Sequence, residues 1–130
     1  MSKPSVELFT DGSCNENTRG KDNLGGFCAI LRFGAVTKKV HDGFRGTTNN
    51  RMELMAIIAG IETLKVPCEV TAYTDSRYAI CVLGRYKQYL KNPVLRKATK
   101  NKDLILRFAL AAAQHDIRFV FVKGHNGHTM

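Results

Sequence analysis

The sequence contains no apolar run long enough to cross a bilayer, and its start, MSKPSVELF, lacks the apolar segment of a signal peptide. We therefore expect no membrane partner and a cytoplasmic location. Internal repeats and linker-like stretches are also absent, and 130 residues suit one domain. We expect a single domain over residues 1–130, with a monomer as the default state.

Closely spaced cysteines are absent as well. Cys14, Cys28, Cys68 and Cys81 are spread along the chain and form no C-x-x-C pair. A zinc site or a disulfide framework would require tighter spacing. Because Cys28 and Cys68 lie in apolar, strand-like runs, we expect buried, reduced thiols.

Acidic residues are nearly missing from one third of the chain. Residues 77–107 contain nine Lys or Arg and one acid, Asp103, which gives a local net charge of +8. The other 99 residues hold eleven basic and ten acidic side chains, so most of the total charge of +9 lies in this segment. Such a local excess favours a surface that binds a polyanion. A solvated face that serves only solubility is the alternative.

The pattern of apolar and turn residues predicts an α/β domain. The order β-β-β-α-β-α-α-β favours a mixed sheet with helices packed on its faces. We expect Asn49 or Asn50 to be the N-cap of the first helix. The expected elements are strands at 5–13, 25–34 and 35–46, the last partly exposed, a helix at 49–65, a strand at 68–76, a helix at 76–90, a loop or short helix at 91–102, a helix at 103–115 and a strand at 117–125.

Three acids lie at the edges of the expected elements. Asp11 ends the first strand, Glu53 lies in the first turn of the first helix, and Asp75 ends the fourth strand. If the central strands are neighbours, these carboxylates converge, and their mutual repulsion implies a cation such as Mg²⁺ or Mn²⁺. Each acid alone also has a structural explanation, as a turn former, a first-turn helix residue or a helix cap.

Five stretches of the chain resemble those of the type 1 ribonucleases H, which cut the RNA strand of RNA/DNA hybrids. They are FTDGSC (9–14), GGFCAIL (25–31), TTNNRMELMA (47–56), YTDSRY (73–78) and VKGHNGH (122–128), in the family's order. The resemblance implies the ribonuclease H-like fold, an α/β fold whose five-stranded mixed sheet has the order 3-2-1-4-5 and is flanked by helices. It also implies endonucleolytic hydrolysis of the RNA strand with two divalent ions, Mg²⁺ or Mn²⁺, and no organic cofactor.

The resemblance also implies roles for single residues. The implied metal-binding and catalytic carboxylates are Asp11, Glu53 and Asp75, and His125 matches a mobile histidine that assists proton transfer or product release. Small residues beside the first acid leave room for a substrate backbone, short amides can read groove edges, and an arginine can reach a phosphate. The expected substrate contacts are Gly12, Ser13, Thr48, Asn49, Asn50 and Arg77.

Residues 86–102, which we term the basic segment, correspond in position to the basic protrusion with which some family members hold the hybrid. We expect Arg96, Lys97 and Lys100 to bind phosphates there. The chain has no tryptophan, where this region of the family often carries several that line the DNA groove. Tyr86 and Tyr89 either replace them or simply pack the helix.

The tail VKGHNGHTM, residues 122–130, carries a further departure from the family. The family pattern continues beyond it with a helix that opens on a fourth aspartate, which would fall a few residues past Met130. Without that aspartate we expect a ribonuclease of reduced activity that favours Mn²⁺. The alternatives are a weak or inactive nucleic-acid-binding module of the same fold, or a fragment that needs another chain for the fourth carboxylate.

Overall fold

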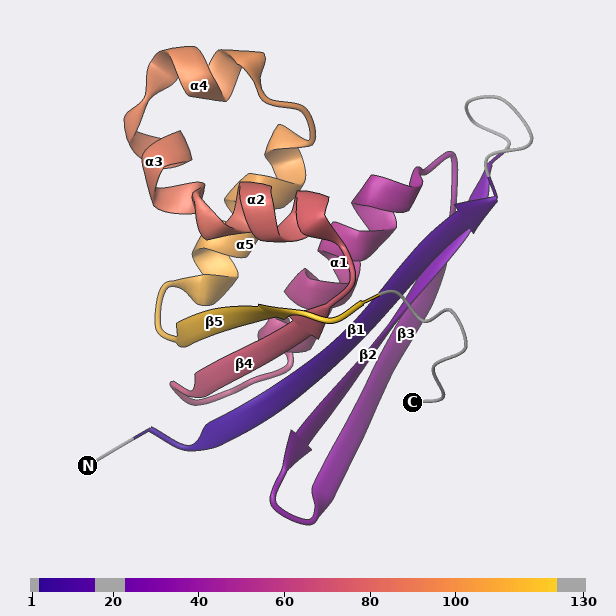
Figure 1. Ribbon diagram of the computed structural model, residues 1–130, viewed down its shortest axis with the longest axis vertical. Helices are drawn as coiled ribbons and strands as arrows, with labels where there is room; N and C mark the ends of the chain where they lie inside the picture. The colour runs from indigo at the N-terminus through magenta and orange to yellow at the C-terminus, as the bar shows by residue number, and fades with distance from the viewer. Residues whose placement is uncertain (1–2, 16–22, 124–130) are drawn as a thin grey trace.

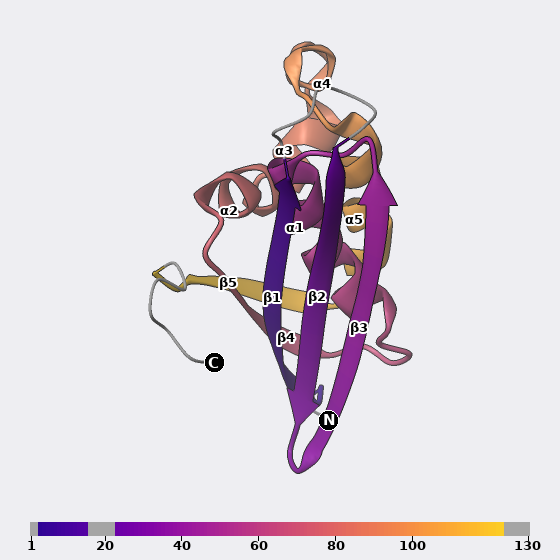
Figure 2. The same cartoon turned by 90° about the vertical axis from the view of Figure 1, so that its right-hand side faces the viewer.

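The computed structural model describes residues 3–15 and 23–123. Its centre is a five-stranded sheet in the order β3-β2-β1-β4-β5, with the described helices on one side (Figure 1 and Figure 2). Antiparallel pairs join β1 to β2 and β2 to β3, and parallel pairs join β4 to β1 and β5, so the expected mixed sheet and its order are confirmed. The elements are β1 (Ser5–Asn15), β2 (Leu24–Phe33), β3 (Val36–Arg45), α1 (Asn49–Glu62), β4 (Glu69–Thr74), α2 (Arg77–Gly84), α3 (Tyr86–Lys91), α4 (Pro93–Ala98), α5 (Lys102–Ala112) and β5 (Asp116–Phe121).

Strand β1 is longer than the sequence pattern predicted. Its inward residues Val6 and Leu8 are buried, as alternation along a half-buried strand requires. The parallel pairing with β4 ends at Phe9 opposite Tyr73, but the antiparallel pairing with β2 continues to Asn15. The expectation that the strand ends at Asp11 is therefore wrong. Asp11 lies inside β1, because β2 continues the hydrogen-bond ladder there.

Strand β3 forms one edge of the sheet. All of its residues except Val40 are exposed, which agrees with the partly exposed strand that the sequence predicted. Its basic side chains are Lys38, Lys39 and Arg45. The strand therefore contributes little to the core and presents a cationic edge.

Helix α1 lies at the centre of the core. Its buried residues surround most of the helix because it packs against β1, β2 and α5. The N-cap is Thr48, whose hydroxyl accepts from the Arg51 N–H at 3.1 Å, and neither Asn49 nor Asn50 fills that position as expected. The side chain of Asn49 instead accepts from the N–H of Cys14 in β1. The helix begins at Asn49, and Glu53 lies in its second turn and not in the first turn as expected.

The helix expected at 76–90 is two helices. α2 ends at Gly84 and α3 begins at Tyr86, with Arg85 between them outside helical geometry (φ −109°, ψ 17°). The next polar stretch forms α4, whose first residue is a proline and whose N-cap is Asn92. Two short helices therefore form an arch that projects beyond α2 and α5 (Figure 1).

The two tyrosines of α3 face the core. Tyr89 is 3% exposed, and Tyr86 meets the ring of Phe108 edge-on at 5.3 Å between ring centres. Of the two roles that the sequence left open, packing is therefore the one that the structure supports. An aromatic surface for the DNA groove at Tyr89 is excluded by its burial.

The four cysteines are free thiols. Cys68 is buried, but Cys14 and Cys28 are half-buried and Cys81 is exposed, so the expected burial is wrong for these three. Cys28 is partly open because it pairs with Asp11 and so lies on the sheet face opposite the core. Within 3–15 and 23–123, no helix has both the length and the apolar character that a membrane span would need.

Candidate active site

The strand register places two of the predicted acids side by side. The parallel ladder between β1 and β4 ends at Phe9 opposite Tyr73, and Asp11 and Asp75 each lie two residues further along their chains. Helix α1 crosses at this point and adds Glu53. Carboxylate oxygens of Asp11, Glu53 and Asp75 all lie within 4.8 Å of one another. The structure thus brings together three acids that are far apart in the sequence.

Gly12 allows α1 to lie against β1. A Cβ atom at this position would lie 2.4 Å from the carbonyl carbon and oxygen of Met52, and 2.7 Å from the backbone nitrogen of Glu53. The Gly12 N–H also donates to Oε1 of Glu53 at 3.0 Å. The space in which a side chain at Gly12 would lie is therefore occupied by the backbone of α1.

Burial and the neighbouring carboxylates raise the pKa of Glu53 to about 8. Burial is the largest cause, followed by the charge of Asp75, a hydrogen bond with Asp75 and, more weakly, the charge of Asp11, while the Gly12 N–H opposes the rise. A cation bound between the carboxylates would reverse this repulsion. A donor set made only of carboxylate oxygens suits a hard divalent ion such as Mg²⁺ or Mn²⁺, so these residues fit that cofactor.

The predicted polar neighbours of the site have structural contacts of their own. Thr48 caps α1, and Asn49 holds the start of α1 to Cys14 of β1. Asn50 is exposed, and Ser13 is exposed on the same face of β1 as Asp11. Two of these four predicted residues therefore hold the start of α1 in place, and the other two are accessible at the surface.

Two of the four predicted basic contacts interact within the chain. The guanidinium of Arg77 lies 4.4 Å from the centre of the Phe121 ring, at the end of β5. Arg96 is half-buried and donates to the Leu90 carbonyl, whereas Lys97 and Lys100 are exposed. His125 lies outside the described residues.

A shallow hollow lies on the open side of the site. It has a volume of about 300 Å³, and its lining includes Asp11, Ser13, Cys28 and His41. The register places Asp11 opposite Cys28, and Cys28 opposite His41, so one row of side chains crosses three strands. Asp11 is therefore open to solvent on the side away from α1.

Sequence reasoning missed one polar network near the site. Arg51 donates to Asp103 and Asn101, and Asn101 donates to Tyr78. Arg51 lies within the recognised stretch TTNNRMELMA, but no spacing rule pairs it with a residue about fifty positions later. The one local hint is Asn101 itself, because asparagine tolerates the left-handed conformation that it adopts here.

Comparisons with known proteins identify the family. The family model RNase H matches residues 3–130. The chain belongs to the ribonuclease H family. A protein named Ribonuclease H from Oleidesulfovibrio alaskensis is 43% identical over 128 residues, which are 95% of this chain and 80% of that protein. Another of the same name, from Hydrogenovibrio crunogenus, is 45% identical over 130 residues, 95% of this chain and 85% of that protein.

Two solved structures agree with the fold. LC9-RNase H1, described as a type 1 RNase H with the type 2 active-site motif, has a TM-score of 0.82 and 28% identity, over 98% of this chain and 67% of that one. A foamy viral protease-reverse transcriptase in complex with dsDNA has a TM-score of 0.69 at 17% identity, over 95% of this chain and 86% of that chain, a likeness of fold alone. The resemblance to type 1 ribonucleases H and the expected fold are therefore confirmed.

Proposed function

We propose that the chain hydrolyses the RNA strand of RNA/DNA hybrids at the site formed by Asp11, Glu53 and Asp75, with Mg²⁺ or Mn²⁺ as the cofactor. The observation that carries this proposal is the approach of the three carboxylates to within 4.8 Å in a chain of the ribonuclease H family. The raised pKa of Glu53 supports it, because the crowded carboxylates favour a bound cation. The experiment below tests both the reaction and the metal site.

The three carboxylates would hold two divalent ions. Bound ions of this kind lower the pKa of the attacking water and neutralise charge that develops on the scissile phosphate. The chain itself supplies placement, because the register of β1 and β4 fixes Asp11 and Asp75, and the Gly12 N–H orients Glu53. Glu53 would release its proton as the cation binds, since the cation removes the repulsion that raises its pKa.

Substrate contacts follow from the charge and exposure around the site. Lys97 and Lys100 are exposed in the basic segment and can bind phosphates without sequence preference. Ser13 and Asn50 are exposed beside the carboxylates, where a 2′-hydroxyl of the RNA strand would distinguish RNA from DNA. We therefore assign phosphate binding to the basic segment and RNA selection to the residues near Asp11.

We also propose that Mn²⁺ supports faster cleavage than Mg²⁺. Mg²⁺ demands near-ideal octahedral geometry and gives up water reluctantly, whereas Mn²⁺ binds a given oxygen site more tightly. A tighter second ion would raise the fraction of protein that is ready to react.

The test is cleavage of an end-labelled RNA/DNA hybrid by the purified chain, with Mg²⁺, with Mn²⁺ and with a chelator. Duplex RNA and duplex DNA of the same sequence are the matched substrate controls. Metal-dependent cuts in the RNA strand of the hybrid alone would support the proposal. Tight binding of the hybrid without cleavage by either metal would contradict it and favour a binding module.

A further inference from the structure

A hydrogen-bonded network joins the start of α1 to the end of the basic segment. Arg51 donates to the two carboxylate oxygens of Asp103 at 3.0 Å and 2.6 Å, and to the side-chain oxygen of Asn101 at 3.0 Å. The side-chain nitrogen of Asn101 donates to the hydroxyl of Tyr78 at 2.7 Å. The network therefore links α1, α2 and the start of α5 at one place.

The position of this network relates it to both parts of the proposed function. Arg51 lies two residues before Glu53, and Tyr78 lies three residues after Asp75, so the network contacts both helices beside the carboxylates. Asn101 lies near the end of the basic segment and directly precedes α5. Because α3 and α4 project beyond the helices below them, the points where the segment is attached determine its orientation (Figure 1).

Asn101 departs from the usual behaviour of an N-cap asparagine in its side-chain hydrogen bonds and in its backbone conformation. It is the N-cap residue of α5, yet its side chain makes no capping hydrogen bond. An asparagine at an N-cap usually accepts from an N–H of the first turn, and that bond is stabilising. Its backbone is also left-handed (φ 61°, ψ 38°), which is uncommon for a residue other than glycine. Such local costs persist where the surrounding contacts offset them, here the bonds to Arg51 and Tyr78.

We propose that the Arg51–Asp103 pair and the Asn101 bridge position the basic segment for the hybrid. They hold the segment at a fixed orientation to the carboxylates, so that phosphate binding and cleavage occur in register along the duplex. Arg51 and Asp103 are thus positioning residues that act through the basic segment and do not contact the reacting atoms. This inference rests on the proposed function, and it adds a structural reason why the basic segment and the cleavage site would work together.

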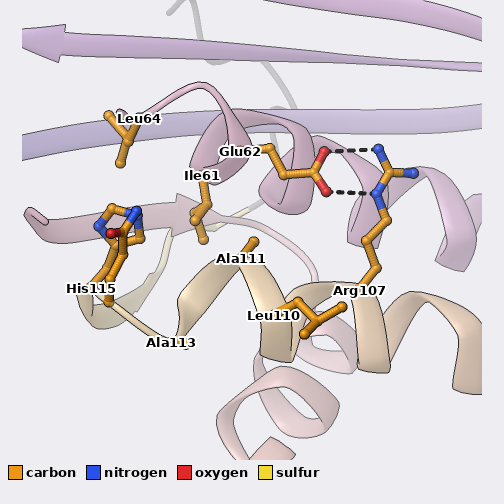
Figure 3. Close-up of a pocket in the computed structure, with 9 residues that line it drawn as sticks. Ile61, Glu62, Leu64, Arg107, Leu110, Ala111, Ala113 and His115 are labelled. Atoms are coloured by element: carbon orange, nitrogen blue, oxygen red, sulfur yellow. Dashed lines mark hydrogen bonds and ion pairs between the residues drawn. The ribbon is translucent and has the colours of Figure 1, made fainter. Parts of the chain in front are cut away.

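A second ion pair provides a matched control. Arg107 of α5 donates to both carboxylate oxygens of Glu62 of α1, at 2.7 Å and 2.8 Å (Figure 3). Both ion pairs join the same two helices, both are bidentate, and both are partly exposed. Glu62 is the last residue of α1, so this pair lies at the opposite end of the helix from the network. Loss of either pair should cost similar stability, but only the first is connected to the basic segment.

The experiment compares Arg51→Met and Asp103→Asn with Arg107→Met and Glu62→Gln. For each variant we would measure kcat and KM on a labelled hybrid, the distribution of cuts on a hybrid of fixed length, and the melting temperature. We expect the first two variants to raise KM by about two- to fivefold and to broaden the cut distribution, with kcat nearly unchanged, as loss of one partly exposed pair would allow. The two control variants should lower the melting temperature similarly and leave KM and the cut distribution as in the unmodified protein.

Unchanged KM and cut distribution in Arg51→Met and Asp103→Asn would overturn the inference, and so would an equal rise of KM in the control variants. If the unmodified chain cleaves no hybrid, the proposed function fails, and the positioning role is then tested by hybrid binding alone. The affinity is measured by fluorescence anisotropy with a labelled hybrid in an Asp11→Asn background, without divalent ions. Weaker binding after Arg51→Met, but not after Arg107→Met, would support the positioning role, and equal binding would refute it.

Discussion

Replacement of Gly12 by alanine tests how tightly α1 is held against β1. The added Cβ would lie 2.4 Å from two backbone atoms of Met52, well inside van der Waals contact. Met52 is 2% exposed in the most buried helix, so its backbone cannot move away without displacing the core. Insertion of a methyl group into a packed core costs about 1–3 kcal/mol, and rigid backbone neighbours place Gly12→Ala at about 3 kcal/mol or above. For a domain of this size that loss lowers the melting temperature by roughly 10 °C or more.

The same substitution should reduce cleavage more than stability alone explains. A displaced α1 moves Glu53 away from Asp11 and Asp75, and the geometry of a metal site tolerates little displacement. The assay is thermal unfolding by circular dichroism together with hybrid cleavage well below the melting temperature. Gly84→Ala is the matched control, because nothing lies within 4 Å of a Cβ there and alanine favours the helix. A Gly12→Ala protein with unchanged melting temperature and activity would show that α1 is not in close contact with β1.

Three other predictions concern charge. Asp11→Asn should abolish cleavage while folding and hybrid binding persist, since it removes a proposed ligand but little packing; cleavage at the unmodified rate would refute the assignment. Replacement of Arg96, Lys97 and Lys100 by glutamine should weaken hybrid binding and reduce the log–log salt slope by roughly two to three, one phosphate per residue, whereas an unchanged slope would indicate a solvated face. The pKa of Glu53 is raised from 4.5 to about 8, so the unfolded state loses this proton first, and the metal-free protein should lose stability as pH rises between these values. Melting temperatures in a chelator should therefore fall across that range, less so in Glu53→Gln or with Mg²⁺ present, and an equal fall in Glu53→Gln would refute this origin.

Much of the architecture was predictable because it depends on short-range patterns. Alternating and helical apolar spacing located all five strands and α1, and the family resemblance implied the strand order that the structure shows. The helix break at Arg85 was missed, although Gly84 directly before it is a residue that commonly ends a helix. The N-cap of α1 was also missed. Asn49 is a good cap by type, but its side chain accepts a hydrogen bond from the Cys14 N–H of β1.

Part of the candidate site was likewise predictable from the sequence, and part was not. The three acids could be selected from the sequence because the recognised stretches contain all three, although Asp11 lies inside β1 and Glu53 lies in the second turn of α1. The packing of α1 against Gly12 was not predicted, because only the structure shows that α1 fills the space where a Cβ at Gly12 would lie. The Arg51–Asp103 pair joins residues that no local sequence pattern connects, so only the structure shows it.

The exposed edge strand β3 has a consequence for the behaviour of the chain at high concentration. A free strand edge invites the edge of a second copy, and lysines are a common means of preventing such pairing. Lys38 and Lys39 would face like charges on an identical edge, so self-association there is opposed by repulsion. Added salt screens that repulsion and equally screens attraction to phosphates. Concentrated solutions of the protein should therefore be most nearly monodisperse at low ionic strength, where affinity for nucleic acid is highest. Edge-to-edge aggregation should increase as the salt concentration is raised.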